Sequence, residues 1–332
     1  RQMCIRDRLY KGKQRPIIPG HENVGIIAEI DRRTGRKLDF YGEELREGDR
    51  IFICPDIICG KCYYCTHTYP YTWCENMRSY GTTMSCDEPP HLFGGWAEYI
   101  YIFPEVYTYK VPEGMPSEIA VLAENITVAS GLDNLIRFSS IASEGFHTED
   151  TILIQGGGPI GLAHLIRARV IGGGIIIVTD LSNYRLRIAE ECGADYIINV
   201  NNSTSKERIQ RIKELTRSRG VDVVVNCTGV PEVIPEGLET LRKGGIYLDP
   251  GTFVDKTILL NPYRQFVAKS IRYIGLSNIS ITGLGIALKL MKHYLKRFPF
   301  EKIVTHKYKL DEVDQALKKS MESETMKVIV AP

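Results

Sequence analysis

The chain has 332 residues, of which 43% are hydrophobic and 25% are charged, with 42 Lys and Arg against 40 Asp and Glu. This length suits about two domains, and the composition is that of an ordinary globular protein, which excludes wholesale disorder. A formal net charge of +2 gives no sequence-wide reason to bind nucleic acid or an acidic membrane. The apolar runs fall far short of the ~20 residues of a membrane-spanning helix. We therefore expect a soluble protein with neither nucleic acid nor membrane as a partner.

The first part of the chain, up to about residue 120, predicts an irregular and mostly β domain. It is rich in Gly, Pro and Tyr, and turn residues such as Pro19 and Gly20 separate its short apolar runs. These runs predict strands at 24–30, 50–53 and 97–102.

Four of the nine cysteines lie close together within this first part: Cys59, Cys62, Cys65 and Cys74. Thiolates spaced by two residues can share one tetrahedral ion, and four of them leave no open position, which indicates a structural zinc. An iron–sulfur cluster and four thiols without metal are the alternatives. Zinc bound in this way contributes on the order of 10 kcal/mol to folding. Clustered cysteines with an odd total favour a reducing compartment, so we expect a cytoplasmic protein.

From residue 151 onward, apolar strands alternate with segments of helical periodicity. This pattern predicts a doubly wound parallel sheet of the Rossmann type. Its six strands are expected at 151–155, 175–180, 196–200, 221–226, 245–248 and 271–274.

The remaining residues predict a mixed tail that returns to the first domain. Its expected elements are a helix at 286–296, a strand at 303–308, a helix at 310–321 and a strand at 327–330. The predicted domains are therefore residues 1–132 with 276–332, and residues 133–275.

A glycine-rich turn connects the first strand of the α/β part to its first helix. Gly156 permits a tight turn, Gly158 lets the backbone approach a pyrophosphate, and Gly161 allows the helix to pack closely on the strand. Asp180 ends the second strand, where a carboxylate accepts hydrogen bonds from ribose hydroxyls and repels a 2′-phosphate, which favours NAD over NADP. Arg185 lies close to the end of this strand, where an arginine can instead hold a phosphate. The candidates for cofactor binding are Gly156, Gly158, Pro159, Ile160, Gly161, Asp180 and Arg185.

Several further segments, together with the cysteine cluster and the glycine turn, resemble the zinc-dependent medium-chain alcohol and polyol dehydrogenases. They are Gly20-His21-Glu22, Gly94-Gly95-Trp96-Ala97-Glu98-Tyr99, Leu122-Ala123-Glu124 and Lys327-Val328. The resemblance covers essentially the whole chain. It is strongest to the branch of threonine, sorbitol and glucose dehydrogenases, because Glu124 stands where that branch has a metal-binding Glu.

This resemblance implies a discontinuous GroES-like catalytic domain around a Rossmann domain, with the active site in the cleft between them. It implies one structural zinc and one catalytic zinc, the latter held by an early Cys, by His21 and by Glu124 or Glu22, with one position open. A zinc ion with an open position acts as a Lewis acid on an alcohol whose hydride passes to NAD. The expected partners are a small alcohol or carbonyl substrate and further copies of the chain, in a homodimer or homotetramer.

The sequence departs from the family pattern at several positions. Cys4 is the available early cysteine, but it lies only seventeen residues before His21, and Arg6 stands where a Ser or Thr usually begins a proton relay. Asn125 replaces the Pro that commonly follows the metal-binding Glu. Residues 136–149 predict an enlarged loop. The chain begins with Arg1, and we expect it to be N-terminally truncated.

Two other functions deserve comparison with this one. A zinc-free reductase of the same superfamily would act on an enone or quinone with NADPH, but such proteins usually lack the cysteine cluster and an acidic residue at the position of Asp180. A zinc ribbon that binds nucleic acid, fused to a redox-sensing Rossmann domain, is disfavoured by the near-neutral charge.

Overall fold

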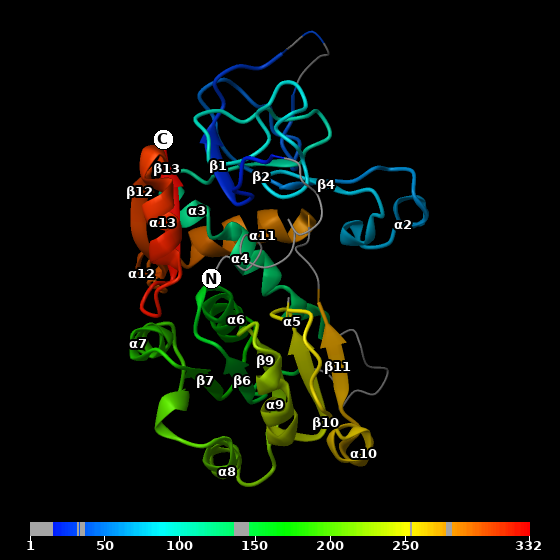
Figure 1. Ribbon diagram of the computed structural model, residues 1–332, viewed down its shortest axis with the longest axis vertical. Coiled ribbons are helices and arrows are strands. Elements are labelled where there is room, and N and C mark those ends of the chain that lie inside the picture. Colours follow the sequence, from blue (N-terminus) through cyan, green and yellow to red (C-terminus); the bar gives the residue numbers. More distant parts are fainter. Residues whose placement is uncertain (1–15, 32, 34–36, 136–145, 253, 277–280) are drawn as a thin grey trace. The chain divides into compact units, whose positions relative to one another are not determined.

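The computed structural model describes residues 16–332 apart from 32, 34–36, 136–145, 253 and 277–280 (Figure 1). The described residues form two compact units. One unit comprises the described residues within 128–278 and 322–326, and the other comprises those within 16–127, 279–321 and 327–332. Nowhere in the described parts of the chain does a helix reach the length and apolar character that a membrane span needs.

The unit built from the middle of the chain contains a six-stranded parallel sheet in the order β11-β10-β9-β6-β7-β8. The order runs outward in both directions from β6 and β9, which makes their carboxyl ends the switch point where nucleotides bind in such sheets. The expected doubly wound α/β architecture is confirmed. The strands are β6 (Ile152–Gln155), β7 (Ile176–Asp180), β8 (Tyr196–Asn199), β9 (Val221–Asn226), β10 (Leu241–Asp249) and β11 (Arg272–Gly275).

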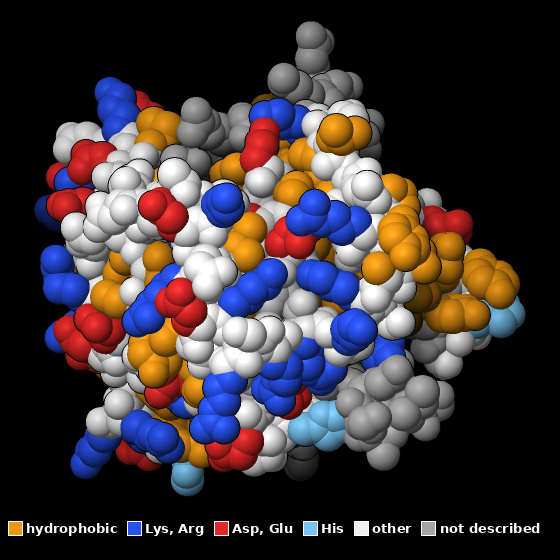
Figure 2. All heavy atoms as spheres, turned by 90° about the horizontal axis from the view of Figure 1, so that it is seen from below, with side chains coloured by type: hydrophobic (Ala, Val, Ile, Leu, Met, Phe, Trp, Pro, Cys, Tyr) orange, Lys and Arg blue, Asp and Glu red, His pale blue; other side chains and the backbone are white. Residues whose placement is uncertain are grey.

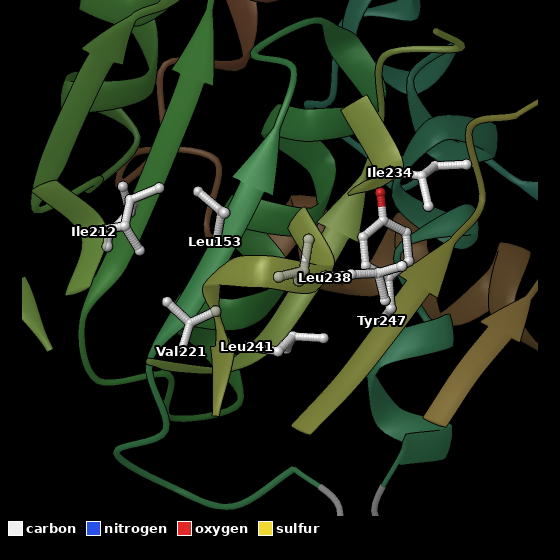
Figure 3. Packing of buried hydrophobic residues seen from close by; sticks show 9 residues of the cluster. Leu153, Ile212, Val221, Ile234, Leu238, Leu241 and Tyr247 are labelled. Carbon is white, nitrogen blue, oxygen red and sulfur yellow. The ribbon is translucent and has the colours of Figure 1, made fainter. Parts of the chain in front are cut away.

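Helices cover this sheet, and an apolar cluster lies beneath two of them (Figure 3). Leu153 of β6 and Tyr247 of β10 pack under Ile212 and Leu238, which come from α8 and α9. The helices of this unit are α5 (Gly131–Asn134), α6 (Pro159–Val170), α7 (Asn183–Glu191), α8 (Ser205–Leu215), α9 (Ile234–Thr240) and α10 (Pro262–Gln265), with short 3-10 turns η3 (Val200–Asn202), η4 (Pro231–Val233) and η5 (Val267–Lys269).

The other unit is mostly irregular and contains three small sheets. β1 (Asn23–Ile26), β2 (Arg50–Ile53) and β5 (Thr108–Lys110) are antiparallel, β3 (Asp56–Ile57) pairs with β4 (Arg78–Ser79), and β12 (Val304–Lys309) runs parallel to β13 (Lys327–Ala331). Its helices are α2 (Tyr63–Thr66), α3 (Ser117–Ala120), α4 (Ala123–Val128), α11 (Ile281–His293), α12 (Phe300–Ile303) and α13 (Val313–Ser320), with 3-10 turns η1 (Tyr71–Trp73) and η6 (Leu310–Glu312).

The strand expected at 97–102 is wrong. Ile100 and Ile102 do pack against an apolar cluster, but the segment forms no strand. A side chain, and not a neighbouring strand, binds its backbone groups at 101 and 103. The hydroxyl of Tyr80 donates a hydrogen bond to the carbonyl of Tyr101 and accepts one from the N–H of Phe103. Backbone groups that a tyrosine satisfies in this way do not form a ladder.

Smaller differences concern the lengths of elements. The strand expected at 24–30 ends at Ile26, and the helix expected at 286–296 spans Ile281–His293 instead. The helix expected at 310–321 begins as the 3-10 turn η6 before α13. The strand expected at 245–248 starts earlier, at Leu241, and carries a shift of register before Ile246. Most of the enlarged loop expected at 136–149 lies outside the described residues.

Candidate active site

Closely packed glycines fix the turn that carries His21. Gly20 has φ +98°, and its carbonyl accepts a hydrogen bond of 2.9 Å from the N–H of Gly95. A Cβ on Gly95 would lie 1.7 Å from Oδ1 of Asn23, and one on Gly20 would lie 2.9 Å from the indole of Trp96. Side chains at these glycines would therefore push the turn apart, which explains why glycines surround a candidate metal ligand.

The structure brings His21, Glu22 and Glu124 together. One ligand atom from each lies within 4.8 Å of the others, which is close enough for a shared metal ion. His21 and Glu22 lie in the turn before β1, and Glu124 lies in the first turn of α4, so residues about a hundred positions apart meet. All three expected ligands that the structure describes are thus in one cluster, whereas Cys4 and Arg6 lie outside the described residues.

The surroundings of the cluster favour a bound cation. Protein atoms desolvate His21, and this burial, together with the charge of Lys327, lowers the pKa of the imidazole to about 4. His21 is therefore neutral at pH 7, as a metal ligand must be. Burial, and secondarily the charge of Asp56, raise the pKa of Glu124 to about 7. A cation would offset the cost of the desolvated carboxylate, so the donor set fits zinc.

Glu22 differs from Glu124 because both of its oxygens already have partners. Lys327 forms an ion pair with Oε2, and the side-chain amide of Asn125 donates a hydrogen bond of 3.1 Å to Oε1. The side chains of Lys327 and Glu22 are only 8% and 12% exposed, so solvent screens this pair little.

Sequence reasoning missed the roles of Asn125 and Lys327. Lys327 was recognised only as part of a closing motif, and it reaches Glu22 across 305 positions of the chain. Asn125 was recognised only as a departure from the family's Pro. No local pattern signals contacts of this range, although a buried asparagine beside a candidate ligand Glu is a reason to look for a polar network.

The four clustered cysteines form a second candidate metal site in the same unit. Their sulfurs lie within 4.8 Å of one another, with distances of 3.5 Å between Cys62 and Cys65 and 4.0 Å between Cys59 and Cys65. A tetrahedral zinc with Zn–S bonds of about 2.3 Å requires sulfurs about 3.8 Å apart, so the set fits zinc. The pKa of Cys59 is lowered to about 6, chiefly by a hydrogen bond from the backbone N–H of Lys61. A lowered pKa favours the thiolate, which is the form that binds a metal.

An aromatic cluster covers the loop that these cysteines hold. Tyr63 stacks on His67 and on Tyr69, and Tyr69 stacks on Trp73. Tyr63 and Trp73 are each more than half exposed. Figure 2 shows hydrophobic side chains gathered beside a histidine at its right-hand edge, the side on which α2 lies in Figure 1.

The glycine turn has the geometry of a dinucleotide cradle. Gly156 follows β6 with φ +101°, and Gly158 is the N-cap of α6. A Cβ on Gly161 would lie 1.8 Å from the carbonyl oxygen of Gly156, so only glycine allows this helix to approach the strand. The nearest atom to a Cβ on Gly158 would be a guanidinium nitrogen of Arg185, 3.9 Å away. The space in front of the helix N-terminus therefore has room for a phosphate. Pro159 and Ile160 form the first turn of α6.

Asp180 lies beside this cradle at the end of β7. Its Oδ2 accepts a hydrogen bond of 2.8 Å from the N–H of Gly157, and its Oδ1 accepts one of 2.8 Å from the N–H of Ser182. Each carboxylate oxygen can accept a further hydrogen bond from a ribose hydroxyl. Arg185 lies 3.9 Å from Oδ2 and donates a hydrogen bond of 2.6 Å to the carbonyl of Thr325, so this arginine is tied to protein groups.

Comparisons with known proteins agree with this geometry. Residues 2–113 match the family model of the alcohol dehydrogenase GroES-like domain, and residues 159–292 match that of the zinc-binding dehydrogenases. Sorbitol dehydrogenase from Halalkalibacterium halodurans is 30% identical over 321 residues, which cover 96% of this chain and 84% of that protein. L-threonine 3-dehydrogenase from Thermococcus kodakarensis is 29% identical over 319 residues, 96% of this chain and 82% of that protein.

A solved structure extends the likeness to three dimensions. Alcohol dehydrogenase from Thermotoga maritima superposes with a TM-score of 0.86 at 31% identity, covering 95% of this chain and 84% of that chain. Fold, cysteine cluster and glycine cradle thus define a zinc-binding dehydrogenase. The chain belongs to the family of zinc-dependent medium-chain alcohol and polyol dehydrogenases. It is accordingly an oxidoreductase, and the family finding favours this function over a nucleic-acid-binding module or a zinc-free reductase.

Proposed function

We propose that the chain transfers a hydride between a secondary alcohol, polyol or hydroxy amino acid and NAD, at a zinc ion bound by His21 and Glu124. The observation that carries this proposal is the pairing of a neutral, desolvated imidazole with a desolvated carboxylate inside a cluster only 4.8 Å across. The sorbitol and threonine dehydrogenases among the relatives support this range of substrates. A second zinc, bound by the cysteine cluster, has a structural role.

Glu124 is the better candidate for the carboxylate ligand. Glu22 has one oxygen in the ion pair with Lys327 and the other on the amide of Asn125. To bind a metal, Glu22 would have to leave Lys327, a charged partner that is itself 8% exposed, and separating a buried ion pair is costly. Glu22 thus neutralises Lys327 next to the cluster, and Glu124 is left to balance the charge of the metal.

The residues of the chain provide orientation and charge balance for this chemistry. The zinc ion, when bound, supplies Lewis acidity that makes an alcohol easier to deprotonate and a carbonyl easier to reduce. His21 remains neutral at the working pH and so presents a lone pair, and the glycine turn before β1 keeps its ring in place. Gly158 and the N-terminus of α6 bind the pyrophosphate of NAD, and Asp180 orients its adenosine ribose.

The direct test is an assay of the chain with NAD⁺ and a panel of secondary alcohols, polyols and threonine, followed through NADH absorbance. We expect turnover of at least one class, loss of activity after removal of metal with a strong chelator, and recovery with Zn²⁺. Undiminished turnover in a preparation from which all metal has been removed would refute the zinc mechanism. The oligomeric state, for which we expect a dimer or tetramer, can be measured on the same sample by light scattering.

Asp180 is expected to select NAD. Replacing it with alanine removes the acceptor for the ribose hydroxyls and the charge that repels a 2′-phosphate, so the affinity for NADH should fall about 10- to 100-fold while NADPH binding does not weaken. Calorimetric titration with both cofactors measures this change. Asp180→Asn keeps the size of the side chain and serves to separate the charge from the shape. If the unchanged protein bound NADPH more tightly than NADH, the proposed preference would be wrong.

A further inference from the structure

Asn125 connects three charged groups at the candidate zinc site, Glu22, Glu124 and Lys327. It lies in the first turn of α4 and is only 6% exposed. Its Nδ2 donates hydrogen bonds of 3.1 Å to Oε1 of Glu22 and of 3.1 Å to Oε2 of Glu124. Its Oδ1 accepts a hydrogen bond of 3.3 Å from Nζ of Lys327. Both N–H groups and the carbonyl oxygen of the amide are therefore used.

The neighbours of Asn125 determine which way its amide faces. A lysine ammonium can only donate hydrogen bonds, so the amide oxygen must face Lys327. Ionised carboxylates can only accept them, so the NH₂ group must face Glu22 and Glu124. The reverse orientation would place oxygen against oxygen and nitrogen against nitrogen. No other uncharged side chain of this size offers two donors and one acceptor in one plane, and proline, the residue that commonly stands here in the family, offers none.

The geometry points to Asn125 as a positioning residue that gives the two carboxylates different roles in metal binding. It keeps Glu22 in its pair with Lys327 and occupies one oxygen of Glu124, so that the other oxygen alone binds the metal. This inference rests on the proposed function, because it assumes that zinc binds at His21 and Glu124. It goes further by assigning to a residue outside the ligand set the control of how many carboxylate oxygens reach the ion.

Loss of the amide should loosen this arrangement. Without the hydrogen bond to Oε2, Glu124 can rotate and offer both oxygens, and Glu22 keeps only Lys327 as a partner. Groups that orient metal ligands typically change metal affinity by about 10- to 100-fold when they are removed. We therefore expect weaker zinc binding and a higher coordination number in the absence of Asn125.

Two substitutions and one control test the inference on the full chain. Asn125→Ala removes the amide, and Asn125→Pro removes it with the residue that the family commonly has, which the first turn of a helix tolerates. Thr127→Val is the matched control, because Thr127 lies in the same helix, is 1% exposed, and donates its hydroxyl hydrogen bond to the carbonyl of Ala123 and not to the site. Circular dichroism and thermal unfolding establish that each variant is folded.

The readouts are zinc affinity and the visible spectrum of the cobalt-substituted protein. Zinc affinity is measured by competition with a chelating dye, with the cysteine-bound zinc retained. Both Asn125 variants should bind zinc about 10- to 100-fold more weakly and show weaker cobalt d–d absorption, since five-coordinate cobalt absorbs less than tetrahedral cobalt. Thr127→Val should change neither readout.

Different results separate this inference from the proposed function. Wild-type affinity and spectrum in both Asn125 variants would overturn the positioning role, and so would an equal loss in Thr127→Val, which would indicate a general effect on α4. If the unchanged protein binds zinc only at its cysteines, the proposed function fails as well.

Discussion

Replacing His21 with alanine is expected to remove one of two zinc ions and to lower kcat/KM for alcohol oxidation by roughly 10³ or more. A Lewis-acid metal stabilises a reacting oxygen by several kcal/mol, and each 1.4 kcal/mol corresponds to about tenfold in rate. The remaining donors, Glu22 and Glu124, leave the ion without its neutral nitrogen ligand, and Glu22 is held by Lys327. Steady-state kinetics and elemental analysis of the purified variant measure both effects.

The same variant should retain its other binding properties. The cysteine cluster should keep its zinc, and NADH should bind with unchanged affinity, because neither site includes His21. His293→Ala provides a matched control, since His293 lies in the last turn of α11 and takes part in no metal-ligand group among the described residues. A His21→Ala protein with full activity and two zinc ions would show that the imidazole is not a ligand.

Replacing Cys74 with serine is expected to cost the protein its structural zinc and much of its stability. Structural zinc binding is worth on the order of 10 kcal/mol, and a serine hydroxyl is a far poorer ligand than a thiolate at neutral pH. The loop that the proposed zinc would hold contributes little to the apolar core, because Tyr63, Tyr69 and Trp73 are 56%, 44% and 51% exposed. We expect a loss of several kcal/mol in the free energy of unfolding.

Thermal unfolding and limited proteolysis measure this loss. The first cleavage should fall within residues 58–76, the segment that the metal constrains. Cys86→Ser is the control, because Cys86 lies outside the cluster and should leave the zinc content and the melting temperature unchanged. Unchanged stability in the Cys74 variant would mean that the four thiols do not hold a metal that supports the fold.

The parallel sheet and the dinucleotide cradle could be predicted from the sequence because their signals are local. Buried strands of such a sheet are continuous apolar runs, and β9 was predicted at the residues where the structure has it. The cradle needs glycines at fixed spacing between a strand and a helix. A Cβ at position 161 would lie only 1.8 Å from the carbonyl oxygen of Gly156, which shows why no other residue fits there.

The irregular unit was harder to predict because its backbone relies on side chains. The hydroxyl of Tyr80 satisfies backbone groups at 101 and 103, so an apolar run there does not become a strand. At the candidate metal site, the resemblance to a known family predicted His21, Glu22 and Glu124, and the structure brings them together. The ion pair of Glu22 with Lys327 spans almost the whole chain, and only a folded structure reveals it.

The most direct measurement is a crystal structure with anomalous diffraction data collected on both sides of the zinc absorption edge. Two zinc peaks per chain are expected, one among the sulfurs of the cysteine cluster and one about 2.0 to 2.2 Å from a nitrogen of His21 and an oxygen of Glu124. A single peak at the cysteines, in a protein that still oxidises alcohols, would contradict the central claim that His21 and Glu124 hold the catalytic ion.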